Sequence, residues 1–310
     1  MLTGGLQKLT TLDFPGVVSS IVFTKGCNFR CPYCHNPELV ALGFYLKNTA
    51  SRQGPAQPLN GDNAVTHTEA AGVVPCGQDN TALAGVSHSG NARPEDAAVS
   101  DSAPSCPLEP RAEMEELFSF LRKRQGLIDG LVISGGEPCL QPDLPDFCRE
   151  ARKLGYKIKL DTNGSRPAML QKLLDAELLD YVAMDLKTLP ELYGKYGFCS
   201  ESDISAKIAR SINILHSSGV PHEYRTTCVA PYVDMEIISG LTCLVAQGGL
   251  NRTDAMQTVP SAAKIKWFFQ QARLENVLSP NAPMNALSEP EIAELVAEAA
   301  KKVPLASTRQ

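Results

Sequence analysis

The chain has 310 residues, of which 43% are hydrophobic, enough to build one large α/β domain or two small ones. Its net charge of -5 gives no indication of nucleic-acid binding. No apolar run is long enough to span a bilayer, and residues 1–16 carry polar side chains where a signal peptide needs an apolar core. We therefore expect a cytoplasmic protein that binds neither nucleic acid nor membrane.

Short β-branched runs alternate with amphipathic segments along most of the chain. Six runs are predicted to be strands: Val17–Thr24, Leu131–Ser134, Lys157–Asp161, Tyr181–Asp185, Glu223–Val229 and Ile265–Gln270. Apolar residues at helical spacing predict four helices: Glu113–Gln125, a helix that Asp203 could cap and Gly219 ends, a helix ahead of Gly248, and Glu289–Lys302. The last of these is expected to cover the core or to bind a partner.

The alternation of strands and helices predicts a parallel sheet with right-handed crossovers. An open doubly wound sheet and a full or partial barrel both satisfy it. Polar residues follow the carboxyl ends of nearly all the strands, where barrel enzymes build their active sites. We therefore predict an α/β fold, an incomplete (β/α)6 TIM-like barrel over residues 1–42 and 112–285, followed by a C-terminal helix and tail over 286–310.

Residues 43–111 interrupt this pattern. The segment is rich in Ala, Gly, Ser, Asn, Asp and Pro, and it has no aromatic residue after Tyr45. Such a composition cannot bury enough apolar surface to offset the entropy lost on ordering. We predict a disordered, low-complexity insertion. Its widely spaced cysteines and histidines are interpreted as incidental rather than as metal ligands: Cys76, Cys106, His67 and His88.

Three of the ten cysteines form the most informative motif, directly after the first predicted strand. Cys27, Cys31 and Cys34 have C-x3-C-x2-C spacing. A structural zinc site or an electron-transfer [4Fe–4S] cluster takes four protein ligands. Three thiolates on a cubane instead leave one iron open to a substrate, so the spacing favours a catalytic cluster. A zinc loop that borrows a fourth ligand, such as His35, is the alternative.

The other cysteines outside the insertion are interpreted as small buried hydrophobes: Cys139, Cys148, Cys199, Cys228 and Cys243. A second motif, Gly135-Gly136-Glu137-Pro138, follows the second predicted strand. Its two glycines would let a ligand approach the backbone closely, and Glu137 can accept hydrogen bonds from an ammonium group.

Together these motifs resemble those of the radical S-adenosylmethionine (SAM) enzymes. Within them the chain is most similar to the activating enzymes of glycyl-radical enzymes, in particular those that serve anaerobic ribonucleoside-triphosphate reductase. The resemblance is carried by Gly4–Lys8, Asp13–Gly16, Gly26–Val40, Leu127–Asp146, Lys159–Gly164, Asp180–Lys187, Arg225–Thr227 and Trp267–Gln271.

The resemblance implies that Cys27, Cys31 and Cys34 hold a [4Fe–4S] cluster whose fourth iron is chelated by the methionyl amine and carboxylate of SAM. Lys187 would pair with that carboxylate, and Arg225 matches an arginine of the cofactor pocket. From the residues alone, Lys187 could instead serve only to neutralise a neighbouring carboxylate.

Three further residues, Gly135, Gly136 and Glu137, would hold the methionyl amine. The remaining positions that match the SAM pocket of the family are Tyr33, Asn36, Asp161, Thr162 and Asp185. Tyr33 would contact the adenine, and the two aspartates and Thr162 match positions that also form a monovalent-cation site in a related activase. The alternative is that the aspartates are structural carboxylates held by backbone amides. Asn163 belongs to an ordinary turn signal and is left unassigned.

The reaction implied is that of an oxidoreductase. One electron from a flavodoxin or ferredoxin-type reductant would reduce the cluster, and cleavage of SAM would give methionine and a 5′-deoxyadenosyl radical. The radical would take a hydrogen atom from a glycine Cα of a partner glycyl-radical enzyme, here anaerobic ribonucleotide reductase.

Two other functions stay open. A radical SAM enzyme that acts on a small molecule, such as a deazapurine synthase, has a similar barrel. A non-catalytic iron–sulfur or zinc-binding protein belongs to another class, but it would need no pocket for a charged amino acid of the kind that Glu137, Lys187 and Arg225 suggest.

Overall fold

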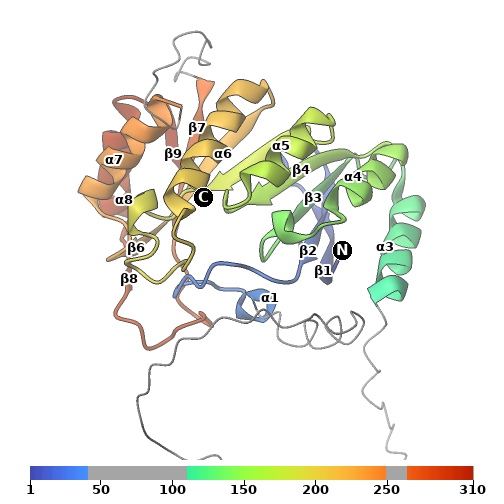
Figure 1. Ribbon diagram of the computed structural model, residues 1–310, viewed down its shortest axis with the longest axis horizontal. Coiled ribbons are helices and arrows are strands. Elements are labelled where there is room, and N and C mark those ends of the chain that lie inside the picture. Colours follow the sequence, from blue (N-terminus) through green and yellow to red (C-terminus); the bar gives the residue numbers. More distant parts are fainter. Residues whose placement is uncertain (41–109, 249–263, 310) are drawn as a thin grey trace, which may run out of the picture. The chain divides into compact units, whose positions relative to one another are not determined.

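The protein is described by a computed structural model over residues 1–40, 110–248 and 264–309 (Figure 1). The insertion expected over 43–111 falls almost entirely outside these ranges, so its extent and disorder stay predictions. The side chains considered there as weak metal ligands lie outside them as well: Cys76, Cys106, His67 and His88.

All strands of the described residues belong to one sheet. They are β1 (Thr3–Thr10), β2 (Ser19–Thr24), β3 (Gly130–Gly135), β4 (Lys157–Thr162), β5 (Tyr181–Asp185), β6 (His222–Ala230), β7 (Lys266–Gln271), β8 (Asn285–Ala286) and β9 (Leu305–Thr308). The order across the sheet is β1-β2-β3-β4-β5-β6-β7-β9, and β8 pairs with β6. From β2 to β9 neighbouring strands in this order are parallel, whereas β1 and β8 run antiparallel to their partners.

Helices connect the parallel strands (Figure 1). They are α1 (Pro37–Val40), α3 (Pro110–Arg124), α4 (Leu144–Lys153), α5 (Pro167–Asp175), α6 (Ile204–Ser218), α7 (Met235–Ala246) and α8 (Glu289–Ala300), with short 3-10 turns η2 (Pro138–Leu140) and η3 (Pro190–Leu192). A parallel sheet whose two edge strands do not pair with each other confirms the predicted incomplete TIM-like barrel. None of the described helices is long and apolar enough to cross a bilayer.

The six predicted strands and four predicted helices are confirmed, with shifts of up to three residues at their ends. Strands β1, β8 and β9 were not predicted. β9 follows α8 and pairs with β7, so the expected C-terminal tail contributes a further parallel strand to the sheet. Asp203 occupies the position before α6, but its side chain makes no capping hydrogen bond and pairs with Lys207 at 2.9 Å instead.

The two faces of the strands carry different residues. In β4, Ile158 and Leu160 are fully buried in the main apolar core, whereas the intervening Lys159 reaches Asp161 on the other face. A second, small apolar cluster lies toward the amino ends of the strands on that inner face: Phe14, Ile21, Val132 and Tyr181. The inner face is therefore apolar near one end of the barrel and charged toward the other, where the candidate site lies.

A buried histidine, His216, and a half-buried one, His222, lie near the amino end of β6. The rings of His216 and His222 are 5.5 Å apart, and His216 is 4% exposed with neither ring nitrogen hydrogen-bonded within the described residues. Burial, with a smaller contribution from His222, lowers the pKa of His216 to about 4 from its ordinary 6.5. The folded protein therefore keeps this ring neutral where the unfolded chain binds a proton.

We expect the free energy of unfolding to fall as the pH drops below about 6.5, because only the unfolded state is protonated between 6.5 and 4. Between pH 7.5 and 5.0 the share of His216 is about 2 kcal/mol. Urea denaturation of the wild type and of His216→Leu at both pH values measures it. If His216→Leu lost as much free energy of unfolding as the wild type between these pH values, His216 would not be the cause.

Candidate active site

The loop after β2 carries the three cysteines. Cys31 is 5% exposed, and Cys27 and Cys34 are partly buried. Backbone contacts hold the start and the middle of the loop: Gly26 N–H donates to the Leu39 carbonyl at 2.7 Å, and Arg30 N–H donates to the Phe198 carbonyl at 2.8 Å.

Aromatic side chains between the cysteines anchor the same loop. The ring of Phe29 packs edge-on against Tyr193 at 5.3 Å, and the ring of Tyr33 lies 5.7 Å from Phe198 and 5.6 Å from Tyr232. These contacts bury Phe29 and Tyr33, and the thiols line the cavity beside them.

A cavity of about 450 Å³ opens where the strands end. It is lined by the three cysteines and by nine other predicted site residues: Tyr33, Asn36, Gly135, Gly136, Asp161, Thr162, Asp185, Lys187 and Arg225. A second cavity of about 670 Å³ shares five lining residues with it: Tyr33, His35, Thr227, Gln270 and Arg309. The residues singled out from separate strands of the sequence thus meet in one place.

Arg225 lies between the two aspartates of the cavity. Its Nη1 is 3.1 Å from Asp161 Oδ2, and its Nε is 2.9 Å from Asp185 Oδ1. Lys159 Nζ lies 2.6 Å from Asp161 Oδ1, and Lys187 Nζ lies 3.2 Å from Asp185 Oδ2. Three cations therefore face two carboxylates. Two of these cations, Lys187 and Arg225, line the cavity and can face an anionic group of a ligand.

The charged state of this network follows from its contacts. Burial alone would raise the pKa of Asp161, but Arg225 and Lys159 outweigh it and lower that pKa to about 2. Burial alone would lower the pKa of Lys187, but Asp185 outweighs it and raises that pKa well above its ordinary value. Asp161 and Lys187 are therefore ionised at neutral pH.

The same contacts bear on the alternatives raised for these residues. The aspartates are held by side-chain cations and, for Asp161, by the Ser134 hydroxyl at 3.1 Å, not by backbone amides. Lys187 does pair with Asp185, as the structural interpretation required. Because their carboxylate oxygens already have such donors, this geometry gives no support to a monovalent-cation site.

Glu137 is the one predicted site residue that the cavity lining does not include. It is fully buried. Its Oε1 accepts from Cys139 N at 3.0 Å and Thr162 Oγ1 at 2.8 Å, and its Oε2 accepts from Asn163 N at 2.6 Å. The carboxylate thus joins the loops after β3 and β4. Its contact with the methionyl amine of SAM stays a prediction.

Close contacts with neighbouring backbone atoms explain why the two residues before Glu137 are glycines. A Cβ on Gly136 would lie 2.2 Å from the Gly26 carbonyl oxygen, and one on Gly135 would lie 2.4 Å from Thr24 N. Gly135 also has a φ of 113°, which disfavours any side chain. The close approach that these residues permit is therefore that of the cysteine loop to the loop after β3.

Two buried polar side chains of the site were not predicted. The Asn163 amide donates to Asn28 Oδ1 at 3.1 Å and lies 3.9 Å from Cys27 Sγ, so it touches the cysteine loop. Lys159 could have been predicted from the sequence. It lies two residues before Asp161 in the same strand, so both side chains are on one face, and apolar residues flank it. The sequence did not indicate a role for Asn163, since Thr-Asn-Gly is an ordinary turn sequence.

The donor set fits an iron–sulfur cluster. Three thiols line one cavity, and thiolates are the ligands that iron–sulfur clusters take. Burial raises the pKa of Cys27 to about 11 and that of Cys31 to about 12, so assembly must displace protons.

The open parallel barrel, with its cysteine loop and charged cavity at the strand ends, defines an α/β-barrel protein of the kind that builds enzyme sites at this edge. The Radical SAM superfamily matches residues 21–239, and the chain belongs to that superfamily. Its cofactors are accordingly a [4Fe–4S] cluster and SAM, as the sequence predicted.

Several characterised or named proteins are similar to the chain. A candidate glycyl-radical enzyme activating enzyme of Methanocaldococcus jannaschii is 28% identical over 77% of this chain and 73% of its own length. The isethionate sulfite-lyase activating enzyme of Nitratidesulfovibrio vulgaris is 27% identical over 81% of each chain. The 7-carboxy-7-deazaguanine synthase of Methanopyrus kandleri is 27% identical over 56% of this chain and 51% of its own length.

Among solved structures, that of TYW1 with a lysine-pyruvate adduct overlaps with 63% of each chain at 16% identity and a TM-score of 0.42. This overlap is too small to support the family assignment.

Replacing Glu137 with Gln is expected to lower the free energy of unfolding by about 1–3 kcal/mol, because the new NH2 group faces buried donors. Urea denaturation of the metal-free protein measures the change. The matched control, Glu150→Gln on the exposed side of α4, should stay within about 0.5 kcal/mol of the wild type. Equal stabilities of the two variants would show that the carboxylate does not join the loops.

Proposed function

We propose that the protein is a glycyl-radical enzyme activase, which generates a glycyl radical on a partner enzyme, and that this partner is anaerobic ribonucleoside-triphosphate reductase. The observation that carries the proposal is the meeting of the cysteine triplet with the charged cavity of Asp161, Asp185, Lys187 and Arg225. The names of the relatives from M. jannaschii and N. vulgaris support the activase class. The particular partner rests on the motif resemblance alone.

In this proposal Cys27, Cys31 and Cys34 hold the cluster, and Lys187 with Arg225 presents positive charge to the carboxylate of SAM. When bound, the two cofactors supply reductive cleavage of a carbon–sulfur bond and a 5′-deoxyadenosyl radical. Gly135 and Gly136 allow the cysteine loop to lie against the strand ends, where SAM would bind. Glu137 positions the loops after β3 and β4 that border the site.

The walls of the cavity suit radical chemistry. Tyr33 is 5% exposed and faces both cavities, so its ring can pack against an adenine while the aromatic cluster behind it excludes water. The second cavity reaches α8 through Ile292 and Glu289. Together the two cavities offer room for a peptide segment beside SAM, which a protein substrate requires.

Replacing Cys31 with Ala is expected to abolish both iron retention and SAM cleavage, because two thiolates do not hold a cubane. Iron content, and methionine released after dithionite reduction, are the measurements. The control is Cys228→Ala, a fully buried cysteine outside the cavity, which should keep both properties. A Cys31→Ala protein that still cleaves SAM would contradict the cluster assignment.

A second candidate function is favoured by the similarity to 7-carboxy-7-deazaguanine synthase. In that case the protein would be a radical SAM enzyme that acts on a small molecule, and the cavity beside SAM would bind that molecule instead of a peptide segment.

Electron paramagnetic resonance separates the two functions. We expect a glycyl-radical doublet when the reduced protein and SAM are incubated with anaerobic ribonucleotide reductase. The doublet should be absent with a reductase whose radical glycine is replaced by alanine. SAM cleavage with no radical on the reductase or on other glycyl-radical enzymes would favour the small-molecule function.

A further inference from the structure

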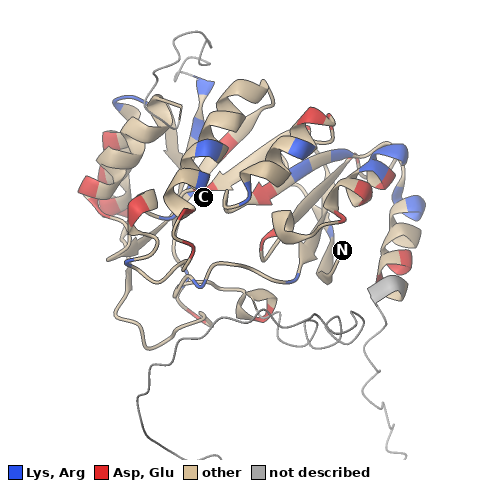
Figure 2. Cartoon of the chain, viewed as in Figure 1, with Lys and Arg blue, Asp and Glu red and all other residues tan. Residues whose placement is uncertain are grey.

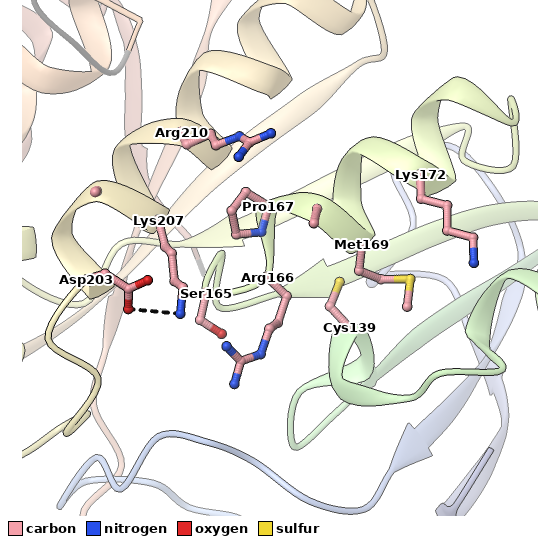
Figure 3. A pocket seen from close by; sticks show the side chains of 11 residues that line it. Cys139, Ser165, Arg166, Pro167, Met169, Lys172, Asp203, Lys207 and Arg210 are labelled. Atoms are coloured by element: carbon pink, nitrogen blue, oxygen red, sulfur yellow. Dashed lines mark ion pairs between the residues drawn. The ribbon is translucent and has the colours of Figure 1, made fainter.

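A groove of about 670 Å³ lies between α5 and α6, and none of its lining residues lines the cavities described above (Figure 3). Its floor is mostly apolar, with Pro167, Ala168, Met169 and Ala206 among the lining residues. Its rim carries four cations, two from the α5 side and two from α6: Arg166, Lys172, Lys207 and Arg210.

The cations fall into two pairs. Arg166 and Lys207 share the Glu201 carboxylate, at 2.7 and 2.5 Å, and Lys207 also pairs with Asp203. Lys172 and Arg210 are exposed, and no acidic partner contacts them within the part of the chain that the structure describes. Two uncompensated positive charges therefore stand on adjacent helices of a chain whose net charge is -5 (Figure 2).

The groove is connected to the cysteine loop by hydrogen bonds. The Asn28 amide donates to Ser165 Oγ at 3.0 Å and to Glu201 Oε1 at 3.2 Å. Ser165 lines the groove, and Asn28 follows Cys27 directly in the chain. Polar contacts thus lead from the groove floor to the residue next to the first cluster ligand.

We propose that this groove is the docking site of a small acidic electron-carrier protein that reduces the cluster. The proposal rests on the cluster being held by Cys27, Cys31 and Cys34. In the step, the reduced carrier loses one electron and the cluster gains it, from the 2+ to the 1+ level, and no bond forms or breaks. The rim charges attract an acidic surface, and the apolar floor gives it a short-lived contact, as weak electron-transfer complexes require.

Other occupants fit less well. A small anion would leave the apolar floor uncovered, and the groove does not enclose it. The substrate enzyme must reach the reacting atoms of SAM, which the cavity beside Tyr33 and Arg225 would hold, and the groove shares no lining residue with that cavity.

The test is the binding of a flavodoxin to the cluster-loaded protein, measured by calorimetry at low and high salt. The double charge reversal K172E/R210E is expected to weaken binding at least tenfold at low salt and to flatten the salt dependence. The matched control K123E/K157E makes the same charge change at exposed lysines outside the groove. It should change binding by less than threefold.

Reduction of the cluster provides a second measurement. Stopped-flow bleaching by reduced flavodoxin should slow at least tenfold in K172E/R210E, whereas SAM cleavage driven by dithionite, which needs no docking, should match the wild type. Flavodoxin binding unaltered in K172E/R210E, or weakened equally in the control, would overturn the proposal. So would loss of binding to the glycyl-radical enzyme with flavodoxin binding intact.

A different result would show that the proposed activase function is wrong. In that case dithionite-driven cleavage in the wild type would produce no glycyl radical on any partner, while the flavodoxin measurements would still report on the groove.

Discussion

The site depends on how a buried guanidinium is compensated. Arg225 sits inside the barrel on β6, where leaving a lone charge would cost several kcal/mol. The parallel register places Asp185 of β5 directly beside it, and Asp161 of β4 reaches it from one strand further. With Lys159 and Lys187 attached to the two carboxylates, the network holds the side chains at the charged end of the inner face in fixed positions.

Two parts of the chain build the site. The strands carry the charged side chains, whose positions follow from the pairing register and from the alternation of side chains between the two faces. The loop after β2 supplies the thiols, and its position depends on aromatic packing and on backbone contact with Gly136. Glu137 joins the parts, because it accepts hydrogen bonds from the loops after β3 and β4 while its own N–H donates to Gly26 at 2.8 Å. A rigid connection of this kind is what preorganised chemistry requires.

Sequence periodicity predicted the six strands and four of the helices, since β-branched runs and amphipathic helices are local signals, but it did not predict α4 and α5. It missed β1, whose Gly-Gly and mixed polar residues carry no strand pattern, and β9, which is four residues long and is a strand only because β7 lies beside it. Twelve of the thirteen predicted site residues line the cavity because strand ends converge by topology. Glu137 does not, since the direction of a side chain after a Gly-Gly turn depends on contacts with Thr162 and Asn163 that lie far away in the sequence.

The groove between α5 and α6 could not be predicted from the sequence for a related reason. Lys172 and Arg210 are ordinary exposed helix residues, and only the packing of the two helices brings them to one rim. Its separation from the cavities has a consequence for turnover. A carrier in the groove and a peptide beside Tyr33 would contact different elements, so both can be bound when SAM is cleaved. The radical can then form with its substrate in place, while the electron arrives from the side of Asn28 and Ser165.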